Sequence, residues 1–487
     1  MKESVQIVDK ASFFFSSQEK TNQFQKYDEF LAWFEEKNNN YFVVEQIAFS
    51  ELDQWSFTSG NESLVHKSGK FFRIEGIKVQ TNFGEITEWE QPIINQPEIG
   101  ILGVLTKVIN GVRYFLMQAK MEPGNVNILQ LSPTVQATKS NFSRVHKGKL
   151  PNYLEYFVDS SKSKTLIDQL QTEQGGRFLR KRNRNIVIEV TEEIEVLEDF
   201  CWLTLFEIKK LLKIDNFVNM DARSVISTIP LVDDIVVDAL QHKQLANVDA
   251  MQINERVYNG IDLDLIISCC SQITNLSSKD QIISWYTGMK VKYELTTNQI
   301  PLLNIKNWSI SDTNINYNDR FFSVIAVKVI AGTREVTSWT QPLIKDHNIG
   351  LIGFIIKKMD GVFHFLVQAK VEPGNLDVIE LSPSVSCSNY EFLLQNTDKQ
   401  PPFFSYFAEN SSSSSSYVLF DAIQSEEGGR FYQMQNRNKI IILDETEELT
   451  IPENYCWMTL NQMMDFMRYS MFNIEARSLI SSIDFNS

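Results

Sequence analysis

The sequence predicts an α+β protein, a tandem repeat of two domains with mixed β-sheets and flanking helices. The first observation is an internal duplication, because residues 118–125 read QAKMEPGN and residues 368–375 read QAKVEPGN. The second is the length of 487 residues, which exceeds what one hydrophobic core usually organises. The third is that each copy combines a hairpin pattern with a capped-helix pattern. We therefore place the first repeat at 1–235, a linker with some helix at 236–277 and the second repeat at 278–487.

A β-hairpin is the clearest local prediction in each repeat. Two apolar alternating runs within 101–120 are joined by Asn-Gly at 110–111, and Asp-Gly stands at the matching place, 360–361. These dipeptides favour the positive backbone dihedrals of a type I′ turn. Because side chains alternate along a strand, one face of the second strand changes from apolar to polar toward Gln118 and Lys120.

Helical segments are predicted at the start and near the end of each repeat. An amphipathic segment surrounds Trp33 in the first copy and Trp285 in the second. Thr204 is followed three residues later by Glu, and Thr459 by Gln, which is the pattern of a helix capping box. Apolar residues at 205, 208, 211 and 212 then recur at helical spacing.

Composition excludes several classes of function. With 46 basic and 61 acidic residues the net charge is −15, which argues against binding to nucleic acid or to an anionic membrane surface. The start of the chain lacks the pattern of a secretory leader, and no apolar run approaches membrane-spanning length, so we expect a soluble, cytoplasmic protein. The five cysteines fit neither a metal site nor a disulfide framework. Without a nucleotide-binding glycine loop or a metal-ligand cluster, we expect side-chain chemistry with no cofactor and no metal.

The duplicated octapeptide carries the first candidate site. If the strand remains extended, Lys120 and Glu122 share a face with Gln118, and Pro-Gly at 123–124 then predicts a turn. A lysine beside a carboxylate and a glutamine can combine proton transfer with hydrogen bonding, whereas an exposed ion pair at a strand end would do little. The return of the octapeptide in the second copy favours ligand contact. The further candidates are Asn125, Gln368, Lys370, Glu372 and Asn375.

The second candidate site follows paired glycines at 175–176 and 428–429. Each pair precedes an arginine and then an Asn-Arg-Asn triplet. Paired glycines permit close backbone approach and arginine forks suit phosphate oxygens, so we place a pyrophosphate here. The alternative is a solvated turn with surface arginines. The candidates are Arg177, Asn183, Arg184, Arg430, Asn436 and Arg437.

Three single residues are further candidates. His146 has no counterpart in the second copy; histidine carries protons near neutral pH, although a single histidine is more often structural. Trp89 and Trp339 precede twin Gln-Pro steps. They can stack on a nucleobase or belong to the core.

The chain resembles the NDP-hexose 2,3-dehydratases of deoxysugar biosynthesis over nearly its whole length. The matching stretches are 118–125, 131–138, 153–157, 173–185 and 219–224 in the first copy, and 371–374, 424–431 and 475–479 in the second. The chain departs from the family at Ser384 and Ser386, where members tend to carry Thr and Gln. We expect an altered or weakened second pocket if these positions contact ligand.

The resemblance implies tandem domains of Nudix-like fold, a homodimer and a nucleotide-sugar substrate, usually dTDP-4-keto-6-deoxyglucose. It also implies loss of water across carbons 2 and 3, giving a 3,4-diketo-2,6-dideoxy sugar that a separate ketoreductase reduces. The sequence lacks the Arg-Glu-Xaa-Xaa-Glu-Glu-Xaa-Gly element of Nudix hydrolases. The expected likeness is therefore one of fold only.

Such an elimination needs a base for the hydrogen on carbon 3, a donor for the developing enolate and an acid for the carbon-2 hydroxyl. We expect Glu122 or His146 to be the base and Lys120 to stabilise the enolate or serve as the acid. Tyr156 is an alternative proton donor, and Arg177 with Arg184 would clamp the pyrophosphate. The competing hypotheses are a nucleotide-sugar-binding or scaffold protein without turnover, and a nucleotide hydrolase, whose metal motif is missing.

Overall fold

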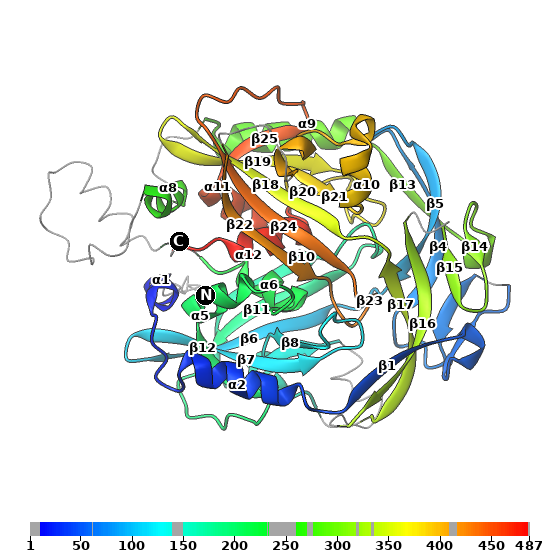
Figure 1. Ribbon diagram of the computed structural model, residues 1–487, viewed down its shortest axis with the longest axis horizontal. Helices are drawn as coiled ribbons and strands as arrows, with labels where there is room; N and C mark the ends of the chain where they lie inside the picture. Colours follow the sequence, from blue (N-terminus) through cyan, green and yellow to red (C-terminus); the bar gives the residue numbers. More distant parts are fainter. Residues whose placement is uncertain are drawn as a thin grey trace, which may run out of the picture.

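The protein, described here as a computed structural model, is α+β and has two lobes, one built mainly from each repeat (Figure 1). Its sheets are antiparallel or mixed, so the predicted fold class and repeated architecture are confirmed. The residues that the structure describes are 10–60, 62–138, 150–230, 232, 260–269, 276–317, 321–332, 336–408 and 416–485.

Each lobe contains a seven-stranded mixed sheet. The strands of the first are β6 (Gly100–Ile109), β7 (Val112–Met121), β8 (Leu129–Ser132), β9 (Val135–Ala137), β10 (Lys164–Thr172), β11 (Arg182–Glu189) and β12 (Phe200–Thr204). Those of the second are β18 (Gly350–Met359), β19 (Val362–Lys370), β20 (Glu380–Ser382), β21 (Val385–Cys387), β22 (Ser416–Ser425), β24 (Gln435–Leu443) and β25 (Tyr455–Thr459). The orders β10-β11-β6-β7-β12 and β22-β24-β18-β19-β25 correspond, and in each sheet the central pair, β11 with β6 or β24 with β18, is parallel.

The helices fall at matching places in the two copies. The α-helices are α1 (Lys10–Gln18), α2 (Tyr27–Lys37), α4 (Leu154–Val158), α5 (Leu205–Leu212), α6 (Met220–Ile226), α8 (Gly260–Ser268), α9 (Lys279–Lys292), α10 (Tyr390–Gln395), α11 (Leu460–Met467) and α12 (Ile474–Ser482). Short 3₁₀ turns are η1 (Phe49–Glu51), η2 (Leu302–Asn304), η3 (Thr397–Lys399) and η4 (Phe404–Phe407). Both capping boxes are confirmed, since the Thr204 hydroxyl accepts from the Glu207 amide at 3.2 Å and that of Thr459 from the Gln462 amide at 3.3 Å.

The hairpins have the predicted turns. Asn110 and Gly111 have φ values of 52° and 83°, and Asp360 and Gly361 have 50° and 79°, as a type I′ turn requires. The strands on either side are β6 and β7 in the first copy and β18 and β19 in the second. The predicted polar strand ends are therefore placed correctly at the end of each hairpin.

Each repeat lends one strand to the other, which the sequence did not reveal. One smaller sheet contains β2 (Trp55–Phe57), β3 (Ser63–His66), β4 (Arg73–Thr81), β5 (Glu88–Asn95) and β13 (Leu295–Ile300). The other contains β1 (Phe42–Ile47), β14 (Ser309–Ile310), β15 (Asn314–Asn316), β16 (Phe322–Ala331), β17 (Ser338–Asp346) and β23 (Phe431–Tyr432). Thus β1 of the first repeat pairs with β16 of the second, and β13 pairs with β4 (Figure 1). The domain limits stay a prediction, but the repeats are not independent bodies.

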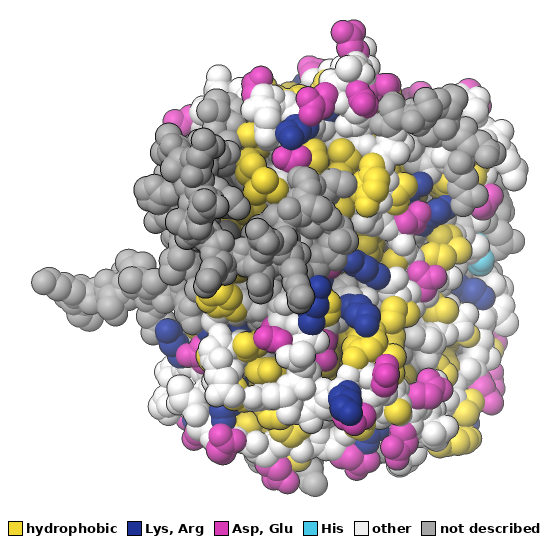
Figure 2. All heavy atoms as spheres, turned by 60° about the vertical axis from the view of Figure 1, so that its left-hand side comes forward, with side chains coloured by type: hydrophobic (Ala, Val, Ile, Leu, Met, Phe, Trp, Pro, Cys, Tyr) yellow, Lys and Arg dark blue, Asp and Glu magenta, His cyan; other side chains and the backbone are white. Residues whose placement is uncertain are grey.

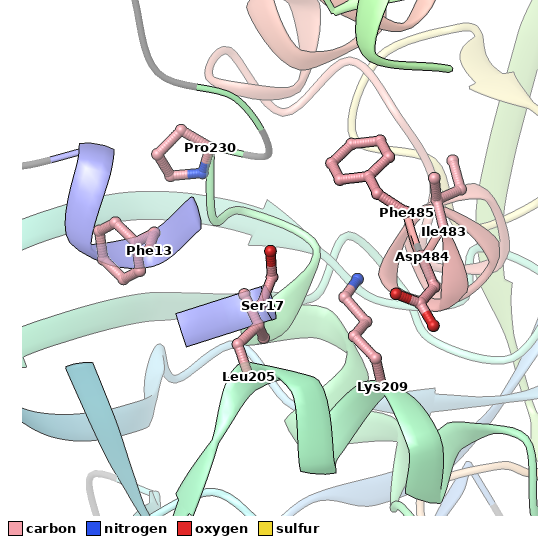
Figure 3. A pocket seen from close by; sticks show the side chains of 8 residues that line it. All are labelled: Phe13, Ser17, Leu205, Lys209, Pro230, Ile483, Asp484 and Phe485. Carbon is pink, nitrogen blue, oxygen red and sulfur yellow. The ribbon is translucent and has the colours of Figure 1, made fainter. Parts of the chain in front are cut away.

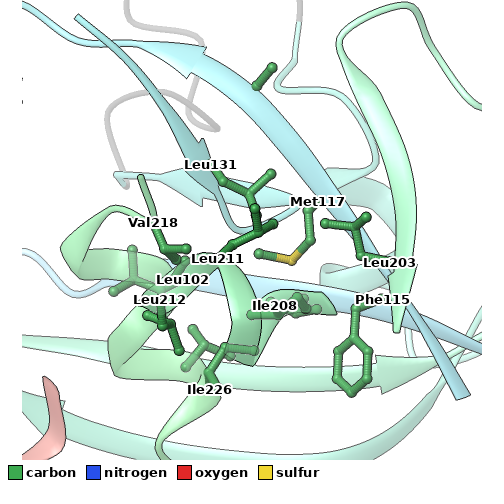
Figure 4. Close-up of a cluster of buried hydrophobic side chains, with 14 of the residues drawn as sticks. Leu102, Phe115, Met117, Leu131, Leu203, Ile208, Leu211, Leu212, Val218 and Ile226 are labelled. Carbon is green, nitrogen blue, oxygen red and sulfur yellow. The ribbon is translucent and has the colours of Figure 1, made fainter. Parts of the chain in front are cut away.

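The core follows the same exchange. Ile208 and Leu211 of α5 pack over Phe115 and Met117 of β7 (Figure 4), and the same buried cluster includes Val327 of β16 from the second repeat. Burial of this amphipathic helix face against the sheet is the main source of its stability.

Each repeat contains a fully buried arginine that donates hydrogen bonds to groups of the opposite repeat. Arg223 on α6 donates to the Ser425 carbonyl at 2.5 Å, the Ser478 hydroxyl at 2.9 Å and the Gln424 side chain at 3.1 Å, all in the second repeat. Arg477 on α12 donates to the Thr172 carbonyl at 2.5 Å in the first. Burial lowers the pKa of both arginines only to about 10, so both remain charged at neutral pH.

We expect Arg223→Ala to lower the free energy of unfolding by about 3 kcal/mol, because it leaves several buried acceptors without a donor and opens a void. Urea unfolding followed by circular dichroism measures the change. Lys306→Ala is the control, since its side chain is 75% exposed. Equal changes in the free energy of unfolding for the two variants would contradict the proposed role of Arg223 in joining the repeats.

Candidate active site

A lysine–glutamate pair lies at the end of β7. Lys120 Nζ is 3.0 Å from Glu122 Oε1, and the two side chains are 17% and 6% exposed. The predicted turn follows, with the Asn125 amide donating to the Glu122 carbonyl at 3.2 Å. The pair is therefore largely shielded from water. Ion pairing in such a place is stronger than at an exposed strand end.

A glutamine and an aspartate of the same repeat join this pair. Gln136 on β9 donates from Nε2 to Glu122 Oε1 at 3.0 Å, whereas Glu122 Oε2 is buried and has no hydrogen-bond partner among the described residues. Asp221, in the first turn of α6, is also buried. Burial, then the nearby Glu427 carboxylate, raise the pKa of Asp221 well above its usual range, although Lys120 opposes this. Oε2 of Glu122 is thus placed to accept a proton. The nearby Asp221, with its raised pKa, favours the protonated form.

The second repeat closes the site. The Gly124 amide donates to the Gly428 carbonyl at 2.8 Å, and the Gly374 amide donates to the Gly175 carbonyl at 2.7 Å. A Cβ on Gly428 would lie 2.0 Å from Asn125 Oδ1, so this approach requires glycine. Each Glu-Pro-Gly-Asn turn therefore packs on the paired glycines of the other repeat.

Because Glu427 adjoins Gly428, it brings a carboxylate of the second repeat to this site. Burial raises the pKa of Glu427 while Arg430 lowers it, and Glu122 raises it further. We name this group the first centre; its members are Lys120, Glu122, Gln136, Asp221 and Glu427.

The second centre consists of Lys370, Glu372, Ser386 and Glu475. Lys370 Nζ lies 2.9 Å from Glu372 Oε1, 3.7 Å from Glu475 Oε2 and 3.2 Å from Ser386 Oγ. Burial lowers the pKa of Lys370, but the two carboxylates more than offset this and raise it above its usual value. Ser386 donates to Glu475 at 2.8 Å, whereas its counterpart Gln136 holds a glutamate of the turn. The hydrogen-bond networks of the two centres therefore differ at this position, and an altered or weakened second pocket stays a prediction.

The remaining octapeptide candidates lie beside the two centres. Gln118 and Gln368 are half-buried near the strand ends. Asn125 and Asn375 are buried against the other repeat's glycines, and their Oδ1 atoms have no hydrogen-bond partner in the described part of the chain.

Arg177 and Arg430 bridge the two repeats. Arg177 lies over the Phe322 ring at 3.9 Å and 3.4 Å from Asp346. Arg430 lies over the Phe72 ring at 4.2 Å. Both guanidinium groups are thus engaged by the opposite repeat, and their pyrophosphate role stays a prediction.

Arg184 and Arg437 form cross-strand pairs within their own sheets. Arg184 binds Asp168 through Nε at 2.8 Å and Nη2 at 2.7 Å, and Arg437 binds Asp421 at 2.8 Å through both. The structure does not bring either arginine into contact with the strand-end lysines. A phosphate bound by Arg184 or Arg437 would have to compete with the aspartate that each arginine already binds.

Asn183 and Asn436 hold buried glutamates. Their Nδ2 atoms donate to Glu173 at 2.7 Å and to Glu426 at 2.6 Å. Burial raises the pKa of Glu173, and likewise of Glu426, to about 7. In the structure these asparagines therefore bind the glutamates that precede the glycine pairs in the chain.

Trp89 and Trp339 occupy equivalent positions. Each indole Nε1 donates at 2.8 Å to a nearby glutamine, Gln91 or Gln341. Gln91 Nε2 in turn donates to the Gly176 carbonyl at 3.0 Å. Both tryptophans pack partly against buried apolar clusters, and their stacking on a base stays a prediction.

Tyr156 is half-buried and separate from these groups. Burial raises its pKa, and Glu192 then raises it further, while Lys162 lies 5.6 Å from its ring centre. The structure does not show Tyr156 in contact with Lys120. His146 lies outside the described residues.

A small cavity lies where α1, α5 and the C-terminal segment meet (Figure 3). Lys209 points into it and donates to the Ser481 carbonyl, and burial lowers the pKa of Lys209 to about 8. The lining is Phe13, Ser17, Leu205, Lys209, Pro230, Ile483, Asp484 and Phe485, which includes no member of either centre.

Sequence reasoning missed Gln136, Asp221, Glu427 and Glu475 as site residues. A signal existed for three of them. Asp221 and Glu475 stand at the same place in both copies, directly before Ala-Arg-Ser, and Gln136 corresponds to Ser386, where the chain departs from the family. Nothing in the local pattern indicated Glu427, because its proximity arises from packing between repeats.

A family model and the individual proteins that this chain resembles are all described as 2,3-dehydratases. A family model described as NDP-hexose 2,3-dehydratase matches residues 27–229 and again 279–483. A dTDP-4-dehydro-6-deoxy-alpha-D-glucopyranose 2,3-dehydratase of Saccharopolyspora spinosa is 43% identical over 93% of this chain and 90% of its own length. Proteins with the same description from Amycolatopsis orientalis and Streptomyces violaceoruber are 39% and 37% identical over 93% of the chain, covering 89% and 96% of their own lengths.

Among the described residues, no helix combines the length and apolar character needed to cross a membrane. No group of three or more His, Cys, Asp or Glu side chains in the described ranges is arranged to hold a metal ion.

On the face shown in Figure 2, Lys and Arg lie in small groups among acidic and apolar side chains.

We expect Gly124→Ala to destabilise the protein and abolish activity, because its Cβ would lie 1.5 Å from the Phe431 carbonyl oxygen. Gly288→Ala is the control: it lies in α9 with open space around the added carbon, and alanine favours a helix by up to about 1 kcal/mol. Thermal unfolding of both variants measures the effect. A stable Gly124→Ala protein would contradict the docking of the turn.

We expect stability to fall as pH rises from about 5.5 to 7.5. The pKa values of Glu173 and Glu426, raised by burial to about 7, mean that the folded state holds protons that the unfolded state has released. This stabilisation is present at low pH and is lost as pH rises through 7. Thermal unfolding across this range tests it, and Glu173→Gln with Glu426→Gln should flatten the curve. A melting temperature that rises with pH would contradict the assignment.

Proposed function

The chain belongs to the NDP-hexose 2,3-dehydratase family and is therefore a hydro-lyase that acts on a sugar nucleotide, and we propose that its substrate is dTDP-4-keto-6-deoxyglucose. The product is then the 3,4-diketo-2,6-dideoxy sugar nucleotide. The relatives' shared description and their coverage of 93% of the chain support this choice.

The observation that carries the mechanism is the buried Lys120–Glu122 pair, in which Glu122 Oε2 lacks a partner within the described structure. The ketone at carbon 4 acidifies the hydrogen on carbon 3, so Glu122 removes this proton. Lys120 stabilises the enolate oxygen that develops. We assign the base to Glu122 because its Oε2 is buried without a hydrogen-bond partner in the described part of the chain, beside Lys120. His146, the alternative base, lies outside the described residues.

We assign turnover to the first centre and substrate binding without turnover to the second. In the first, Gln136 and Lys120 both hold Oε1 of Glu122, which orients the opposite oxygen. In the second, Lys370 is bound by two carboxylates, and its raised pKa makes it a poor proton donor. Trp89 and Trp339 remain candidates for the base, and Arg177 and Arg184 for the pyrophosphate.

The finer fold and the setting are part of the same proposal. Each seven-stranded mixed sheet with its helices is a Nudix-like unit that has lost the metal-dependent hydrolysis of that fold; the mixed strand order supports this. The protein is a cytoplasmic homodimer, and a ketoreductase consumes its reactive diketone product.

We expect Glu122→Gln to reduce kcat by about 10²- to 10⁴-fold with little change in substrate binding, because the amide cannot accept the proton. Conversion of the 4-keto sugar nucleotide is followed by mass spectrometry, which detects loss of one water, and binding by calorimetry. Glu372→Gln is the matched variant and should have the smaller effect on kcat. Full activity of Glu122→Gln would remove this residue from the mechanism.

The same assay separates the competing functions. Tight binding by the wild-type protein with no loss of water would indicate a binding or scaffold protein. Release of a nucleoside monophosphate that depends on added magnesium or manganese would indicate a hydrolase.

A further inference from the structure

The first centre contains a carboxylate from the opposite repeat, and its position is tightly determined. The Gly428 carbonyl accepts from the Gly124 amide at 2.8 Å, which ties the backbone beside Glu427 to the turn that carries Glu122. A Cβ placed on Gly429 would be 3.1 Å from Glu427 Oε1 and 3.9 Å from Glu122 Oε1, so these two oxygens are at most about 7 Å apart. Carboxyl groups at such separations can act on one sugar ring from two sides.

The surroundings of Glu427 favour its protonated form. Burial raises its pKa, Arg430 opposes this, Glu122 adds to it, and Lys181 and Lys120 oppose it, with a net rise. The pKa of the adjacent Asp221 is raised as well, first by burial and then by Glu427. Glu427 and Asp221 therefore both favour the protonated form relative to an exposed carboxyl group.

The two copies differ at this position. Gln174 stands before Gly175 where Glu427 stands before Gly428, and an amide cannot release a proton in this range. A titratable group from the opposite repeat is therefore present at the first centre, whereas its counterpart at the second is a glutamine.

We propose that Glu427 is the general acid of the elimination, so that the second repeat supplies a catalytic group to the site of the first. This inference rests on the proposed function. Glu122 takes the proton from carbon 3, and the electron pair forms an enediolate between carbons 3 and 4. When the carbon-4 carbonyl reforms, the pair moves between carbons 2 and 3, the carbon-2–oxygen bond breaks, and the Glu427 proton leaves with that oxygen as water. The resulting enol at carbon 3 tautomerises to the ketone.

The test separates the two proton transfers. In D₂O, Glu427→Gln is expected to exchange the carbon-3 hydrogen of the 4-keto sugar nucleotide while losing elimination by about 10²- to 10⁴-fold. Glu122→Gln should lose both exchange and elimination. The control is Glu391→Gln, an exposed carboxylate of the same repeat, which should behave as wild type. NMR follows exchange, mass spectrometry follows loss of water, and circular dichroism checks folding.

Elimination at the wild-type rate by Glu427→Gln, or loss of exchange together with elimination in the folded variant, would overturn the assignment. The wild-type pH profile tests it without any variant, because kcat should fall as pH rises through the pKa of Glu427. A rate that shows no such fall would also overturn the assignment. Wild-type protein that never releases water would instead refute the proposed function.

Discussion

Two buried arginines set the geometry on which both centres depend. Arg223 stands two residues after Asp221 on α6, and its guanidinium binds the carbonyl of Ser425, two residues before Glu427. Hydrogen bonds from a guanidinium are strong and directional, so this contact fixes an acid of one repeat relative to an acid of the other. Arg477 makes the corresponding link from α12 to the carbonyl of Thr172. These links support the direct hydrogen bonds between the turns and the glycine pairs.

The exchange of β1 and β13 has the same consequence at a larger scale. Each smaller sheet is completed by a strand of the other repeat, and one buried cluster joins α5 to β16. A site at the junction of two such repeats is held by both cores, which suits a reaction that needs fixed donors and acceptors. The two sites differ chemically at Ser386, which corresponds to Gln136, and at Gln174, which corresponds to Glu427.

Much of the fold was predictable, because its signals are local. The turns at 110–111 and 360–361 and the caps at Thr204 and Thr459 depend on residues that are neighbours in the chain. The strand-end pair of Lys120 and Glu122 was likewise found from alternation along one strand. The strand exchange was not found, because a strand's sequence does not record which edge it joins.

The sequence by itself determined the repeated α+β architecture, the family, and the strand-end pairs, since periodicity, turn chemistry and shared motifs act over short stretches. Only the tertiary structure decided that the paired glycines receive the opposite repeat's turn, that Arg177 and Arg430 bridge the repeats, and that Glu427 lies near Glu122. The physical reason is that each of these contacts joins residues far apart in the chain and in different repeats. Such contacts arise from close packing of complementary surfaces, and packing leaves no periodic trace in either partner's sequence.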